Sequence, residues 1–121
     1  MDTLSGRALD AALAQRLFGY EIEERTNTLT HKPEILRRLD NNQWVIVSYY
    51  STRMSAGLEV GERLRRLGWT LNEASSNRRP DAAGLHRVAL DGPQGLRVSA
   101  SAETWELALA RAALKAVTLM P

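Results

Sequence analysis

The sequence of 121 residues contains no cysteine. Disulfide bonds, thiol chemistry and cysteine-based zinc sites are therefore excluded. Histidine is almost as scarce: only His31 and His86 are present, and neither has an acidic residue or a second imidazole at the spacing of a metal or catalytic site. We expect no metal site and no bound cofactor.

Several sequence motifs of catalysis are also missing. There is no P-loop, no glycine-rich dinucleotide-binding motif and no serine nucleophile elbow. We therefore expect a protein that is not an enzyme. No apolar run approaches the roughly 18 residues of a membrane-spanning helix, and nothing resembles a signal peptide. The expected location is the cytoplasm.

An excess of charge of one sign is lacking as well. The 16 basic and 14 acidic residues leave a net charge of +2 at pH 7, which by itself does not indicate nucleic-acid binding. Hydrophobic residues make up 44% and charged residues 25%, as in ordinary globular proteins. A chain of this length is typical of one domain, here residues 1–121.

The clearest predicted element is a helix within residues 99–117. This stretch is rich in strong helix formers, contains no glycine or proline, and has Ser101 as its expected N-cap. At 100° per residue, one apolar stripe begins at Trp105 and a second stripe lies opposite it. Both stripes need cover, by the protein's own sheet and by another helix or another subunit. Arg111 and Lys115, four residues apart, form a cationic ridge between the stripes.

Two further helices are expected earlier in the chain. One covers residues 5–18 and ends at Gly19; the other covers residues 54–67 and ends at Gly68. In the first helix, Asp10 is expected to face water. The expected N-caps are Ser5 and the pair Ser51 and Thr52.

The remaining segments predict strands. Residues 44–50 are rich in β-formers and are expected to pair with one of two weaker segments within residues 20–43. Strands at 69–74, 85–90 and 96–100 follow, and the last two form a hairpin with Leu90 opposite Leu96. The element order is roughly α-β-β-α-β-β-β-α, an α/β (α+β) fold.

Arginine and aromatic side chains are the candidates for function. Guanidinium groups bind phosphates through two parallel hydrogen bonds and aromatic rings stack on bases, so this combination suits a nucleotide-like anion. The hairpin leads directly into the last helix, which can bring its arginines close to the cationic ridge. The candidate ligand-binding residues are Arg87, Arg97, Arg111, Lys115, Trp105 and Tyr49.

Structural roles remain open for the same residue types. Trp69 and Trp105 can be core residues, and Arg78 and Arg79 can belong to a solvated loop. The charges on the last helix can be ordinary surface charges.

Three segments together resemble the landmark segments of the phage ABA-sandwich domain family. They are SGRALDAALAQRLFGY, YYSTRMSAGLEVGERLRRLGW and VSASAETWELALARAALKAV, in that order. The resemblance spans nearly the whole chain. It implies a small antiparallel β-sheet sandwiched by helices, encoded by a phage or prophage and acting in the cytoplasm of the bacterial host.

That family is similar to the first-described Thoeris anti-defence proteins, phage sponges that sequester cyclic ADP-ribose isomers. Some of these sponges also hold cyclic oligonucleotides and assemble as dimers or hexamers. The resemblance implies that Arg111 and Lys115 contact phosphates. Lysine at the second position departs from the family pattern, because it keeps the charge but loses the guanidinium fork.

Two alternatives stand beside the sponge hypothesis. The chain could be a nucleic-acid-binding accessory protein, which predicts affinity that falls steeply with salt. It could instead be a protein-interaction module that inhibits a host factor, which predicts capture of a host protein and no small-molecule binding.

Overall fold

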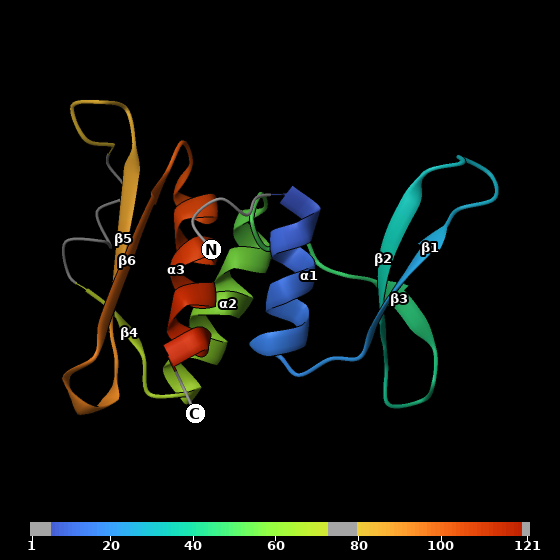
Figure 1. Cartoon of the computed structure of the whole chain (residues 1–121), viewed down its shortest axis with the longest axis horizontal. Coiled ribbons are helices and arrows are strands. Elements are labelled where there is room, and N and C mark those ends of the chain that lie inside the picture. The colour runs from blue at the N-terminus through green and yellow to red at the C-terminus, as the bar shows by residue number, and fades with distance from the viewer. Residues whose placement is uncertain (1–5, 73–79, 120–121) are drawn as a thin grey trace.

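The computed structural model describes residues 6–72 and 80–119. A layer of helices lies between two three-stranded antiparallel sheets (Figure 1). The helices are α1 (Gly6–Arg16), α2 (Met54–Arg66) and α3 (Trp105–Leu119). The first sheet contains β1 (Ile22–Thr26), β2 (Pro33–Arg38) and β3 (Trp44–Ile46); the second contains β4 (Thr70–Leu71), β5 (His86–Asp91) and β6 (Arg97–Ala102). Within these ranges, no helix has the length and apolarity needed to cross a bilayer.

The expected α+β class and its antiparallel strands are confirmed, and the strands and helices follow the expected order with one strand more. Both weak segments before β3 form strands, and β2 pairs with β3. The layers differ from the expected single sheet covered by helices. In the sequence α2 lies between the first three strands and the last three, and each set forms its own sheet on one side of the helices (Figure 1).

Helix α3 is the centre of the core. It packs against β5 and β6 on one side and against α1 and α2 on the other. Both of its apolar stripes are therefore covered, as expected, and elements of the same chain provide the cover. The helix begins after Thr104, whose hydroxyl accepts a hydrogen bond from the Leu107 amide at 3.2 Å. The expected N-cap, Ser101, lies in β6 instead.

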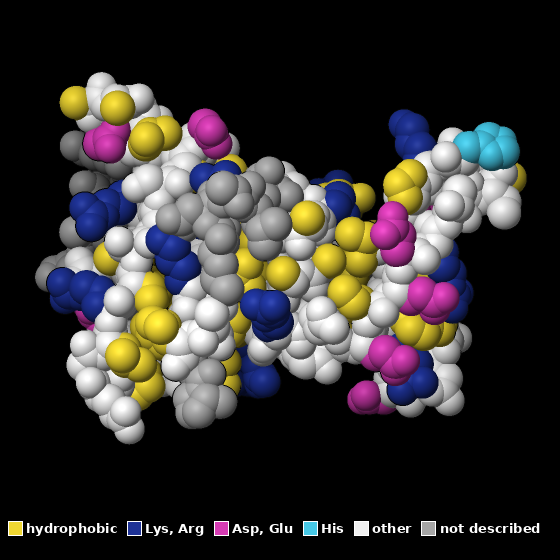
Figure 2. Space-filling view, viewed as in Figure 1, with side chains coloured by type: hydrophobic (Ala, Val, Ile, Leu, Met, Phe, Trp, Pro, Cys, Tyr) yellow, Lys and Arg dark blue, Asp and Glu magenta, His cyan; other side chains and the backbone are white. Residues whose placement is uncertain are grey.

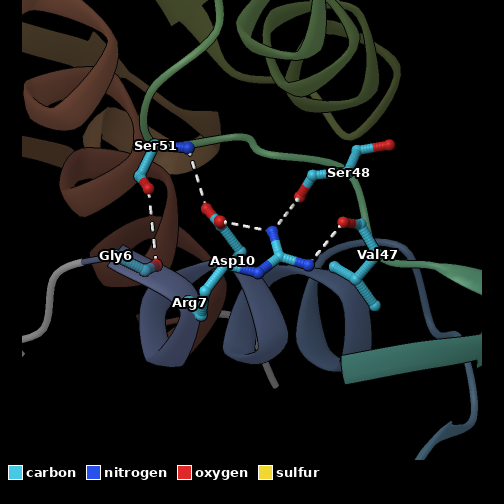
Figure 3. Close-up of polar contacts among 6 residues, drawn as sticks. All are labelled: Gly6, Arg7, Asp10, Val47, Ser48 and Ser51. Carbon is cyan, nitrogen blue, oxygen red and sulfur yellow. Dashed lines mark hydrogen bonds and ion pairs between the residues drawn. The ribbon is translucent and has the colours of Figure 1, made fainter. Parts of the chain in front are cut away.

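Helix α1 differs from its predicted orientation at one position. Asp10 is fully buried, although the helical pattern placed it in water. Its Oδ1 accepts a hydrogen bond from the Ser51 amide at 2.8 Å, and its Oδ2 accepts one from the Arg7 guanidinium at 2.8 Å (Figure 3). Arg7 also donates to the carbonyls of Val47 at 2.6 Å and Ser48 at 3.3 Å. The network holds α1 against the connection between β3 and α2, and its hydrogen bonds satisfy the buried carboxylate.

The same network explains why the expected cap of α2 was wrong. The Ser51 hydroxyl donates to the Gly6 carbonyl at 3.4 Å, toward α1 (Figure 3). The N-cap of α2 is Arg53, which makes no side-chain capping bond. At the other end the prediction is confirmed, because Gly68 follows the helix with a φ of 94°.

The β5–β6 hairpin has a register two residues away from the predicted one. Leu90 lies opposite Val98 rather than opposite Leu96. A shift of two residues keeps every side chain on its predicted face. Val88 and Val98 are therefore buried as expected, and Arg87 lies on the exposed face.

A stack of aromatic rings joins the connection between β3 and α2 to the segment after α1. Phe18 stacks on Tyr50 with 5.0 Å between ring centroids and on Tyr20 with 5.5 Å. Only 1% of Tyr50 is exposed. Burial, reinforced by Tyr20, raises the pKa of the Tyr50 phenol to about 12.

This shift predicts a loss of stability at alkaline pH. The unfolded phenol ionises near pH 10 and the folded one near 12, so the folded state binds the proton more tightly. The contribution is complete below pH 10 and is lost as pH rises toward 12, up to about 2.7 kcal/mol. Urea unfolding at pH 8 and pH 11 measures it. Tyr50→Phe should flatten this pH dependence; an equal slope in both proteins would contradict the assignment.

Candidate functional site

The side chains of Arg111 and Lys115 lie along the free edge of the second sheet. Within the part of the chain that the structure describes, strand β6 pairs with a neighbour, β5, on one side only. Lys115 Nζ donates to the Ser99 carbonyl at 2.7 Å, and Arg111 Nη1 donates to the Ser101 carbonyl at 3.1 Å. Four residues of helix rise about 6 Å and two residues of strand about 6.8 Å, so the two spacings match.

These two bonds have a structural consequence. Edge carbonyls need partners, and an unprotected edge strand can pair with other chains. Both cations are half-buried against β6 and cover part of its edge. Ammonium and guanidinium groups each carry several N–H donors, so a carbonyl contact and an anion contact can coexist on one side chain.

A shallow depression of about 410 Å³ opens beside this edge. Arg87 lines it from β5 and Lys115 lines it from α3, while β6 contributes Ser99 and Ser101. Asp81 adds one carboxylate to the rim; its Oδ1 already accepts hydrogen bonds from two nearby backbone amides. Figure 2 shows several Lys and Arg side chains on the side of the molecule that carries this sheet.

Three of the predicted residues therefore come together. Arg87 and Lys115 share the depression, and Arg111 contacts Ser101 on its wall. Arg97 does not join them, because its Nε donates to Asp91 Oδ1 at 2.6 Å. This contact, together with a hydrogen bond from Asn72, lowers the pKa of the Asp91 carboxyl.

The two predicted aromatic residues lie elsewhere. Trp105 is 94% buried and lines a separate groove with Trp69, between α2, β4 and α3. Core packing therefore accounts for both tryptophans. Tyr49 precedes α2 and lies between two guanidinium groups, with Arg7 at 4.0 Å and Arg53 at 4.8 Å from its ring centroid. The depression is lined by no aromatic residue among those described.

The sequence argument missed the serines and Asp81 as lining residues. The alternation of β6 offers a signal for Ser99 and Ser101, because they share the exposed face with Arg97. Asp81 has no comparable signal, because it lies in an irregular segment before β5. The predicted loop residues Arg78 and Arg79 lie outside the described residues. Over residues 6–72 and 80–119, no cluster of three His, Asp or Glu could hold a metal ion. The arrangement can bind an anion through charge and hydrogen bonds.

Comparisons with known proteins show a related fold. No family model matches the sequence, and no curated protein matches it. The structure is similar to a crystal structure described as a phage protein from Bacillus cereus ATCC 14579, with a TM-score of 0.69. The two chains are 20% identical, and the match covers 94% of this chain and 93% of the other. The similarity extends over both sheets and the helices between them, so the two proteins share this fold.

Proposed function

We propose that this chain binds a nucleotide-derived second messenger at the β6-edge depression and sequesters it without cleaving it. The observation that carries the proposal is the convergence of Arg87 and Lys115 on one depression, with Arg111 beside it. The proposed ligands are cyclic ADP-ribose isomers and cyclic oligonucleotides, whose phosphates match this charge.

The chemistry of the depression supports a phosphate ligand. The Arg87 guanidinium can make two parallel hydrogen bonds to a phosphate, whereas the Lys115 ammonium acts as a point charge. The hydroxyls of Ser99 and Ser101 can donate further bonds. The site retains the second messenger without changing it. The affinity of the site and the number of protein copies in the cell therefore determine how far the free messenger concentration falls.

Two observations support an origin in a phage or prophage and action in the bacterial cytoplasm. The three sequence segments resemble the phage ABA-sandwich family, and the fold is similar to that of a Bacillus cereus phage protein. The resemblance of that family to the Thoeris anti-defence proteins implies that the paired cations Arg111 and Lys115 contact the phosphates of the ligand.

A homo-oligomer, either a dimer or a hexamer, completes the proposed site. The described part of the depression provides cations and hydroxyls but no aromatic ring. A base needs a stacking partner for tight binding. A second copy of the chain could place one over the depression, which would make binding depend on assembly.

The experiment is native mass spectrometry with cyclic ADP-ribose isomers and cyclic di- and trinucleotides, followed by calorimetry on any retained ligand. Arg87→Glu should weaken binding at least tenfold, because it places a carboxylate where a phosphate is expected. The matched control is Arg16→Glu, which makes the same charge reversal at an exposed position on α1 outside the depression.

Three outcomes would contradict parts of this proposal. If none of these ligands is retained, the chain is not a sponge for this class. Equal affinities of Arg87→Glu and the parent protein would place the site elsewhere. Recovery of a cleaved ligand after incubation would show that the chain is an enzyme.

A further inference from the structure

A second cavity, separate from the β6-edge depression, lies between α2, β2 and the segment after α1. Its volume is about 640 Å³, within the range of small-molecule sites. Tyr20 and Arg37 line it from the segment after α1 and from β2, and α2 contributes its charged residues Glu59, Glu62, Arg63 and Arg66. Figure 1 shows that the first sheet and the second sheet lie on opposite sides of the helices. The two sites can therefore be tested independently.

Two guanidinium groups in this cavity are held in place without a carboxylate. The Arg37 guanidinium lies 4.1 Å from the centroid of the Tyr20 ring. The Nε of Arg63 donates to the Leu17 carbonyl at 3.1 Å. Neither arginine forms an ion pair within the described ranges, whereas Arg66 pairs with Glu62 at 3.6 Å. Arg37 and Arg63 thus both line the cavity without a carboxylate partner, and their guanidinium groups can donate to an oxyanion there.

The aromatic rings of the cavity wall do not offer a stacking platform. Tyr20 has Phe18 stacked on its ring and Arg37 over it. Phe18 stacks on both Tyr20 and Tyr50. Because these faces are already used within the protein, the cavity does not favour a ligand that binds by base stacking.

The carboxylates of the wall restrict the ligand further. Glu59 lines the cavity and forms no ion pair among the residues that the structure describes. A carboxylate accepts hydrogen bonds from hydroxyl groups and repels a second anion. The wall therefore matches a molecule with one oxyanion end and one hydroxyl-rich end. The volume of the cavity also exceeds what a bare phosphate needs.

We propose that this cavity binds a phosphorylated sugar, with its phosphate on Arg37 and Arg63 and its hydroxyls on Glu59. The site needs no second copy of the chain and does not depend on the second-messenger proposal. The probe for its test is ribose 5-phosphate, compared with ribose and with inorganic phosphate.

Calorimetry and NMR of the arginine Nε–H signals provide the test. Ribose 5-phosphate should bind more tightly than inorganic phosphate, ribose should not bind, and the Arg37 and Arg63 signals should shift. Arg37→Gln should weaken ribose 5-phosphate binding at least tenfold. Glu59→Ala should weaken ribose 5-phosphate binding but not phosphate binding, because it removes the acceptor of the sugar hydroxyls and a charge that repels the anion.

The matched control is Arg38→Gln. Arg38 is the next residue of β2, points to the opposite face of the sheet and pairs with Glu21 at 2.5 Å. Its variant should bind as the parent does. No binding at millimolar probe, equal binding of phosphate and ribose 5-phosphate, or equal losses in Arg37→Gln and Arg38→Gln would overturn the proposal.

Discussion

Replacement of Gly92 by alanine is expected to lower the free energy of unfolding by about 3 kcal/mol. Gly92 follows β5, and a Cβ at this position would lie 2.6 Å from Cε3 and Cζ3 of the Trp69 ring. Trp69 is fully buried, so its rigid ring has no open space into which it can move. The new methyl group must displace either the core or the hairpin turn.

Urea unfolding of the variant measures this effect, with Gly61→Ala as the control. An added Cβ at Gly61 meets no atom within 4 Å, and the residue lies within α2. Alanine there should stabilise the protein by up to about 1 kcal/mol, through helix propensity. The two alanine substitutions should therefore change the free energy of unfolding in opposite directions. A neutral Gly92→Ala would show that the contact with Trp69 can relax.

The second large effect is expected at Asp10. Asp10→Ala should reduce the free energy of unfolding by about 3 kcal/mol, because it leaves the Ser51 amide and the Arg7 guanidinium without their carboxylate partner. The loss should be accompanied by weaker attachment of α1 to the chain before α2. Hydrogen exchange of the Ser51 amide reports that local change directly.

Two variants serve as controls for Asp10→Ala. Asp10→Asn keeps an acceptor oxygen for the Ser51 amide and should cost less than the alanine variant. Glu21→Ala removes an exposed carboxylate paired with Arg38 and should change stability by less than about 1 kcal/mol. If Asp10→Ala costs no more than Glu21→Ala, the buried network does not hold α1 in place.

The pH effect at Tyr50 also depends on tertiary packing. The residues 44–50 read as one strand because they are rich in β-formers, yet β3 ends at Ile46 and Tyr50 enters the core before α2. The composition of residues 44–50 correctly indicated that side chains of this segment enter the core, as Val47 and Tyr50 do. The stack on Phe18 comes from a segment about 30 residues away, and no local periodicity contains that information.

Local patterns determined the approximate positions of the helices, the boundary of α2 at Gly68, and the two faces of the β5–β6 hairpin. These features depend on helix propensity, on glycine at positive φ and on the alternation of strands, which short segments contain by themselves. Helix α1 ends at Arg16, two residues before its predicted end at Phe18. The two apolar stripes of α3 also correctly predicted cover on two sides. The stripes could not show that elements of the same chain cover both sides of the helix.

Tertiary structure alone decided the layers, the burial of Asp10 and the grouping of Arg87 with Lys115. Each depends on contacts between distant segments: the three helices pack together between the two sheets, the Ser51 amide satisfies the Asp10 carboxylate, and the β6 edge receives the cations of α3. The free energy of a buried charge depends on the partners that surround it. Those partners are distant in the sequence, so only the folded chain shows which polar residues are buried and which cations share a site.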